Sequence, residues 1–179
     1  MIDATTSHEP REARGLLKHY LRDLIYGANH GIVTTFAIVT GVTGAALQSR
    51  VVLILGVANL LADGLSMGAS NFLSIRSDEA VRRADGLAAL EPFPFRHGLV
   101  TFLAFVVAGP SVAQLSGGPR LVGVPFAVGL TVVGLFGVGA FRATVADGGW
   151  LRNGLEMLFV GMSAATVAYV VGVLLAPLT

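Results

Sequence analysis

The stretch VVLILGVANLLADGLSMGASNFL, Val51–Leu73, decides the fold class of this chain. It is long and apolar enough for a helix that crosses a bilayer, which needs about 20 predominantly apolar residues. Asp63 lies near its centre, where inserting an aspartate costs roughly 2.5–3.5 kcal/mol. Ionisable residues at such depths are typical of ion or proton pathways, or they have a buried partner. We therefore expect a membrane helix in which Asp63 either takes part in transport or is a structural carboxylate bonded to Asn59 or a threonine.

The rest of the composition agrees with a membrane protein. Only 13% of the 179 residues are charged, against about 25% in soluble domains. The absence of cysteine excludes disulfides, thiolate metal sites and cysteine nucleophiles. None of the apolar stretches alternates as β-barrel strands do. We expect an all-α membrane protein with five transmembrane helices, at about 24–47, 51–73, 98–115, 121–141 and 154–176.

The distribution of Lys and Arg gives the expected orientation, because cytoplasmic loops of membrane proteins are enriched in both. With five spans, only Arg50 and Arg120 fall on the side opposite the N-terminus. We therefore expect the N-terminus in the cytoplasm. The other basic residues then lie on the cytoplasmic side: Arg11, Arg14, Lys18, Arg22, Arg76, Arg82, Arg83, Arg96, Arg142 and Arg152.

Residues 1–23 are expected to form a cytoplasmic N-terminal segment, ahead of a transmembrane domain at 24–179 with a cytoplasmic loop at 75–97. Leu17, Tyr20 and Leu21 recur at helical spacing opposite Lys18 and Arg22, which is typical of an amphipathic helix. Two interpretations remain open. The segment is either an interfacial helix on anionic lipid or a cytoplasmic extension of the first span.

The first two spans form a hairpin that carries most of the polar groups in the membrane. Only Gln48–Arg50 separates them, so the two helices should be antiparallel neighbours. Residues at equal depth should then have numbers that add up to about 97. This register places His30 opposite Met67 and Thr34 opposite Asp63.

Polar residues recur every three or four positions on both helices of this hairpin, which places them on one face of each helix. The pattern predicts a seam accessible to water or ions. Taken singly, a histidine, a methionine or an asparagine in such a helix is more often a packing or hydrogen-bonding residue. The stripes are Tyr26, His30 and Thr34 on the first span and Asn59, Asp63, Met67, Ser70 and Asn71 on the second.

Polar groups outside the spans give weaker signals. Asp78, Glu79, Asp85 and Glu91 are expected in a solvated loop, and Glu156 at the solvated cytoplasmic start of the last span. Alternatively, Asp78, Glu79 and Glu156 collect cations at a cytoplasmic entrance. His8, His19 and His97 show no ligand spacing.

Three segments of the chain resemble the vacuolar iron transporter family. DLIYGANHGIVTTFAIVTGVTGA (Asp23–Ala45) and VVLILGVANLLADGLSMGASNFLS (Val51–Ser74) are similar to its first two helices, and WLRNGLEMLFVGMSAATVAYVVG (Trp150–Gly172) to its last. The resemblance implies five transmembrane helices per protomer and a homodimer. It also implies a metal path on the two-fold axis, lined by the first two helices. Family members export Fe²⁺, and often Mn²⁺, from the cytosol in exchange for protons.

The resemblance assigns roles to individual residues. The methionine of the family's S-M-G/A pattern falls on Met67, and a glutamate of plant-type members falls on Asn59. Asp63 fits the ANLLADG sequence of bacterial-type members. The aspartate of the family's N/S-D-G motif falls on His30, which is a departure. The expected metal ligands are thus Asp63, Met67, His30 and Asn59, and the path is lined by Thr34, Ser70 and Asn71.

Two further features bear on the expected activity. The long glutamate-rich insert of many family members is absent, because only about Ile75 to His97 joins the second and third spans. Imidazole and thioether ligands favour Fe²⁺, Co²⁺, Ni²⁺ or Cu⁺ over harder cations. His30 is thus either an altered ligand or the mark of a member that no longer transports iron.

The expected function is export of Fe²⁺ or Mn²⁺ by proton exchange, in a homodimer embedded in a lipid bilayer. The alternative is a non-transporting structural or regulatory membrane protein of the same fold. No enzymatic activity, resident cofactor or nucleic-acid partner is expected, because hydrolase and phosphate-binding motifs are absent. The expected location is the bacterial cytoplasmic membrane, or the vacuolar membrane in a eukaryote.

Overall fold

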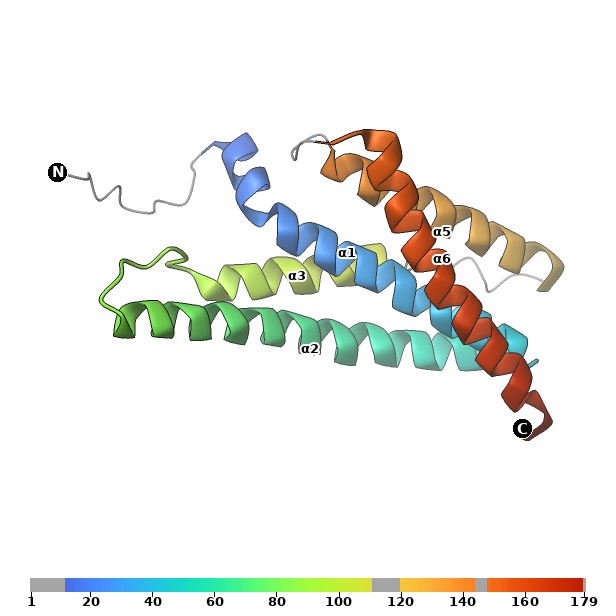
Figure 1. The fold of residues 1–179 in the computed structure, drawn as a ribbon. Coiled ribbons are helices and arrows are strands. Elements are labelled where there is room, and N and C mark those ends of the chain that lie inside the picture. The colour runs from blue at the N-terminus through green and yellow to red at the C-terminus, as the bar shows by residue number, and fades with distance from the viewer. Residues whose placement is uncertain (1–11, 111–119, 144–147, 179) are drawn as a thin grey trace.

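A computed structural model describes residues 12–110, 120–143 and 148–178 (Figure 1). All regular structure in these ranges is helical, which confirms the expected all-α class. The segment 1–11 and positions 111–115 of the third expected span lie outside the described residues. The helices are α1 (Ala13–Gly44), α2 (Ser49–Ala84), α3 (Pro94–Ala108), α5 (Arg120–Arg142), α6 (Trp150–Leu175) and the short 3₁₀ helix η1 (Ala176–Leu178).

Helix α1 is the centre of the arrangement (Figure 1). It packs extensively against α3 and α6 and also contacts α2 and α5. Helices α2 and α3 pair on one side of α1, and α5 and α6 pair on the other. The chain from Ala13 to Gly44 is one uninterrupted helix, so the amphipathic segment continues directly into the first expected span.

The apolar core lies where α1 meets the other helices. Ile32, Phe36 and Val39 of α1 are almost completely buried there, against Leu135 of α5 and Ala165 of α6. These α1 residues recur at helical spacing and therefore form a single apolar face. The polar stripe of Tyr26, His30 and Thr34 lies on the opposite side of α1.

Glycine contacts explain how α3 packs tightly against both α1 and α2. A β-carbon on Gly31 of α1 would lie 2.6 Å from the Phe105 carbonyl oxygen of α3. A β-carbon on Gly68 of α2 would lie 2.8 Å from the Gly98 carbonyl oxygen. Small residues at such positions allow helix backbones to approach closely in membranes. The GxxxG spacings of the first hairpin thus allow α3 to approach both helices.

The turn between α1 and α2 begins earlier than the sequence suggests. The N–H of Ala46 donates to Thr43 O (3.1 Å), and the N–H of Leu47 donates to Val42 O (3.1 Å). This pair of bonds is the Schellman arrangement that ends many helices. Its left-handed position is taken by Ala46, with φ of 55°, where glycine is more usual. Helix α1 therefore ends at Gly44, before the expected limit at Leu47.

In the part of the chain that the structure describes, three helical segments are long and apolar enough to cross a membrane: Arg50–Ala84, Pro125–Arg142 and Trp150–Leu178. Helix α3 is apolar but has only 15 residues in its described part. Helix α2 has 36 residues and is about 54 Å long at 1.5 Å per residue. Since a hydrocarbon core is about 30 Å thick, the charged end of α2 extends well beyond the apolar part that contains Asp63.

Candidate metal centre

The structure brings His30 of α1 and Asp63 of α2 together. The His30 Nε2 atom lies 3.3 Å from Asp63 Oδ2. The two side chains are 40% and 31% exposed, so they lie on an open edge of the α1–α2 pair. Rings flank the imidazole, with centroid distances of 5.9 Å to Phe105 and 6.4 Å to Tyr26. An imidazole nitrogen and a carboxylate oxygen are both atom types that transition-metal ions take as ligands, and the ligand roles predicted for His30 and Asp63 stay predictions.

A second polar contact links the same two helices one turn further on. Thr34 Oγ1 donates to the His30 carbonyl oxygen at 2.9 Å and accepts a hydrogen bond from Asn59 Nδ2 at 3.3 Å. Both side chains are partly buried. The Thr34 hydroxyl therefore holds Asn59 in place beside the His30–Asp63 pair.

These two contacts correct the predicted register. His30 lies against Asp63 rather than opposite Met67, and Thr34 lies against Asn59 rather than opposite Asp63. Each α1 residue is paired with a position one helical turn earlier in α2 than predicted. The cause is the turn, which uses Ala45 to Gln48 instead of Gln48 to Arg50.

The other residues of the expected path have different surroundings. Met67 is buried, with 7% exposure, whereas Ser70 is exposed. Asn71 Nδ2 donates hydrogen bonds to Asp23 Oδ1 of α1 and Thr101 Oγ1 of α3, both at 2.8 Å. Asn71 therefore ties three helices together. Its predicted place in a path, like the ligand role of Met67, stays a prediction.

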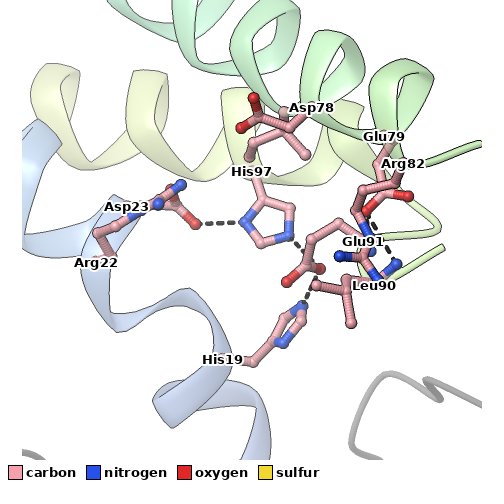
Figure 2. Close-up of a pocket in the computed structure, with 10 residues that line it drawn as sticks. His19, Arg22, Asp23, Asp78, Glu79, Arg82, Leu90, Glu91 and His97 are labelled. Carbon is pink, nitrogen blue, oxygen red and sulfur yellow. Dashed lines mark hydrogen bonds and ion pairs between the residues drawn. The ribbon is translucent and has the colours of Figure 1, made fainter. Parts of the chain in front are cut away.

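A second polar cluster, which the sequence did not predict, lies where α1 and α3 begin. His97 Nδ1 is 2.6 Å from Asp23 Oδ2, and His97 Nε2 is 3.0 Å from Glu91 Oε2. The same Glu91 oxygen lies 3.1 Å from His19 Nε2. Figure 2 shows the Glu91 carboxylate between the two imidazoles and Asp23 on the far side of His97. His19, Glu91 and His97 thus form a group with metal-ligand chemistry.

The cluster borders a cavity of about 310 Å³ between α1, α2 and α3 (Figure 2). Asp78 and Glu79 of α2 also line this cavity. Asp78 is exposed, but Glu79 is only 6% exposed, so the expectation that Glu79 lies in a solvated loop is wrong. Its Oε1 atom accepts hydrogen bonds from the backbone N–H groups of Leu90 (2.9 Å) and Glu91 (2.8 Å). Glu79 therefore fixes the connection that presents Glu91 to the histidines.

The last residue of the expected entrance, Glu156, lies on the other pair of helices. Its Oε2 atom is 3.8 Å from Arg142 Nη2, and its side chain is 60% exposed. This ion pair joins α5 to α6 at the surface. An exposed ion pair of this kind contributes little to stability, and its role at an entrance stays a prediction.

Comparison with known proteins shows which family the chain resembles. The chain matches the VIT family over residues 21–88 and 81–173. "Vacuolar iron transporter homolog 2" of Oryza sativa subsp. japonica is 31% identical over 170 residues, which cover 85% of this chain and 88% of the relative. "Vacuolar iron transporter homolog 1" of the same plant is 30% identical over 166 residues, 84% of this chain and 71% of the relative.

A shorter match has a higher identity. "Vacuolar iron transporter" of Plasmodium berghei is 44% identical over 63 residues, which cover 35% of this chain and 23% of the relative. The rice relatives thus match along most of this chain, and the Plasmodium relative along about a third of it.

Proposed function

The chain belongs to the VIT family, and we propose on this basis that it exports Fe²⁺ or Mn²⁺ from the cytosol in exchange for protons. Family membership supports metal transport by an integral membrane protein, and three helical segments among the described residues have the length and apolarity to cross a membrane. The family also fits the expectation of a transporter rather than an enzyme. The membrane is the cytoplasmic one in a bacterium and the vacuolar one in a eukaryote.

The contact between His30 and Asp63 is the observation that carries the proposal. Two atoms bound to one transition-metal ion at about 2.0–2.2 Å lie about 3–3.5 Å apart. The 3.3 Å between His30 Nε2 and Asp63 Oδ2 lies within this range. An ion between them would thus need little movement of either helix, and Asn59 and Met67 lie one turn away on either side of Asp63.

The exposure of the same pair supports a homodimer. Polar side chains that face lipid are costly, and ionisable ones in membrane helices almost always face protein or a water-filled path. His30 and Asp63 are both partly exposed in the single chain, and neighbouring Tyr26 is 54% exposed. We propose that the same edge of a second copy covers this surface. Two copies of His30 and Asp63 would then line one metal path on the two-fold axis.

The chemistry of these ligands supports proton exchange. A histidine binds a metal through a neutral ring nitrogen, and a carboxylate binds it when ionised, so protons and metal ions compete for the same atoms. A proton that arrives from the opposite side of the membrane would release the ion. The metal preference of the imidazole is for Fe²⁺ or Co²⁺ over harder cations.

One alternative has a specific observation in its favour. His30 and Asp63 satisfy each other directly at 3.3 Å, as a structural pair would in a protein that has kept the fold without transport. Flux into sealed liposomes separates the two functions. A transporter moves Fe²⁺ or Mn²⁺ at a rate that responds to an imposed pH gradient, whereas a structural protein gives the rate of empty liposomes for Fe²⁺, Mn²⁺ and Co²⁺ alike.

A further inference from the structure

We propose that His19, Glu91 and His97 form a second metal site, which binds a divalent first-row transition-metal ion where α1 and α3 begin. The His30–Asp63 pair lies further along α1, where this helix meets α2. Since His19 precedes His30 by eleven residues, the two sites are about 16 Å apart along α1 at 1.5 Å per residue. The site does not depend on the transport proposed above.

The three ligand atoms already lie near the spacing that an ion requires. Glu91 Oε2 is 3.0 Å from His97 Nε2 and 3.1 Å from His19 Nε2. The ligand atoms of all three residues lie within 4.8 Å of one another. Ligands at about 2.0–2.2 Å from a tetrahedral or octahedral ion are separated by about 3–3.5 Å. The His19 side chain is 21% exposed, so its ring has room to turn toward an ion held by the other two ligands.

Asp23 provides the support that metal-bound histidines usually have. Its Oδ2 atom is 2.6 Å from His97 Nδ1, and the Asp23 and His97 side chains are 2% and 5% exposed. When Nδ1 donates its proton to this carboxylate, the lone pair of Nε2 faces Glu91 and is free for a metal. A carboxylate in this place fixes the ring and raises the basicity of the ligand nitrogen. Asn71 Nδ2 in turn donates a hydrogen bond to Asp23 Oδ1 at 2.8 Å, which fixes the position of this carboxylate.

The cavity beside the ligands has an excess of negative charge. Asp23, Asp78, Glu79 and Glu91 all line it, together with Arg22 and Arg82. The Arg82 guanidinium donates two hydrogen bonds to the Ala88 carbonyl oxygen, at 3.0 and 3.2 Å. Two of its N–H groups are therefore used by the α2–α3 connection rather than by the carboxylates of the cavity. Glu79 Oε2 is buried and accepts no hydrogen bond from any residue in the described part of the chain. The cavity therefore offers a cation both space and uncompensated carboxylate oxygen.

The donor set decides the class of ion. Mg²⁺ and Ca²⁺ take oxygen ligands, whereas two imidazoles with one carboxylate suit Zn²⁺, Co²⁺ or Fe²⁺. The ligands come from α1, from the α2–α3 connection and from α3. A bound ion would therefore cross-link these segments, and its effect on thermal stability provides a readout that does not involve transport.

Co²⁺ binding to the purified protein in detergent tests this proposal, measured by visible absorption and by the shift of the melting temperature. The His30→Ala variant, which removes a ligand of the other site, should still bind one Co²⁺ per chain and melt at a higher temperature with Co²⁺. His19→Ala and Glu91→Gln should each weaken Co²⁺ binding by about tenfold or more, the effect of losing a metal-site residue. His19 is partly exposed, and glutamine preserves the shape of Glu91, so both variants should fold.

Two results would overturn the site. One is Co²⁺ binding in His19→Ala and Glu91→Gln that equals the unmodified chain. The other is the complete loss of Co²⁺ binding in His30→Ala, which would place all bound metal at the other pair. In either case the cluster is only a set of hydrogen bonds that joins α1, α3 and the α2–α3 connection. Failure of metal flux in liposomes would leave this test unaffected, because neither readout measures transport.

Discussion

His30 Nε2 and Asp63 Oδ2 lie 3.3 Å apart across the first two helices, although 33 positions separate them in the chain. The contact exists because the α1–α2 turn has only four residues, Ala45 to Gln48, and so the helices remain neighbours on both sides of it. The polar edge that results is part of an otherwise apolar hairpin. Asp63 is thus neither isolated in lipid nor enclosed in a dry core.

Replacing the imidazole of this pair should change the preferred metal. We expect His30→Asp to raise the ratio of Mn²⁺ flux to Co²⁺ flux by about fivefold, the effect of roughly 1 kcal/mol. The physical reason is that carboxylate ligands suit Mn²⁺ better than imidazole does. Parallel flux measurements in liposomes with the two ions give the ratio. An unchanged ratio would mean that residue 30 does not contact the transported ion.

Removing the Asn71 amide should destabilise the protein. The Asn71→Ala change leaves the Asp23 carboxylate, which is 1% exposed, without one of its hydrogen-bond donors. Leaving a buried polar group unsatisfied costs about 1–3 kcal/mol, so the melting temperature in detergent should fall. The neighbouring exposed residue provides a matched control, since Ser70→Ala should melt like the unmodified chain. A variant with normal stability but reduced flux would instead support the predicted place of Asn71 in the path.

Enlarging Gly31 should separate α1 from α3. The new methyl group in Gly31→Ala would lie 2.6 Å from the Phe105 carbonyl oxygen, a distance that backbone atoms can relieve only by moving. Overpacking of this kind costs about 1–3 kcal/mol and should lower the melting temperature. Gly129→Ala in α5 is the control, because among the described residues nothing beyond its own helix turn lies within 4 Å of the new methyl group. Equal melting temperatures for the two variants would contradict the close approach of α3.

The helices of the first hairpin were predictable because long apolar stretches have few alternatives in a membrane protein. Their register was not, since the turn residue in the left-handed conformation is Ala46 rather than a glycine that would have marked it. The four-residue shift in pairing follows directly from that turn. The ligand roles that the family resemblance assigns to residues of this hairpin stay predictions. What the structure adds is the contacts of these residues, which the resemblance did not give.

The cluster at the start of α1 was missed for a different reason. His19 and His97 are far apart in sequence, and they meet only because α3 packs against α1. Glu91 joins them because its backbone N–H donates a hydrogen bond to the buried Glu79. This bond fixes the conformation of a connection that the sequence predicts to be a solvated loop. No periodicity in the sequence carries this information. The nearest signal in the sequence is a histidine near the start of each of two apolar helices, with an aspartate one turn after the first histidine.

Metal flux through the Asp63→Asn variant tests the central claim most directly. Asparagine keeps the size of the side chain but removes the charge and the carboxylate ligand. We expect Fe²⁺ or Mn²⁺ flux in liposomes to fall by about tenfold or more, while Asp85→Asn, which changes an exposed carboxylate at the end of α2, keeps the original rate. Equal flux through Asp63→Asn and the unmodified chain would contradict the account, because the ion would then cross without the carboxylate next to His30.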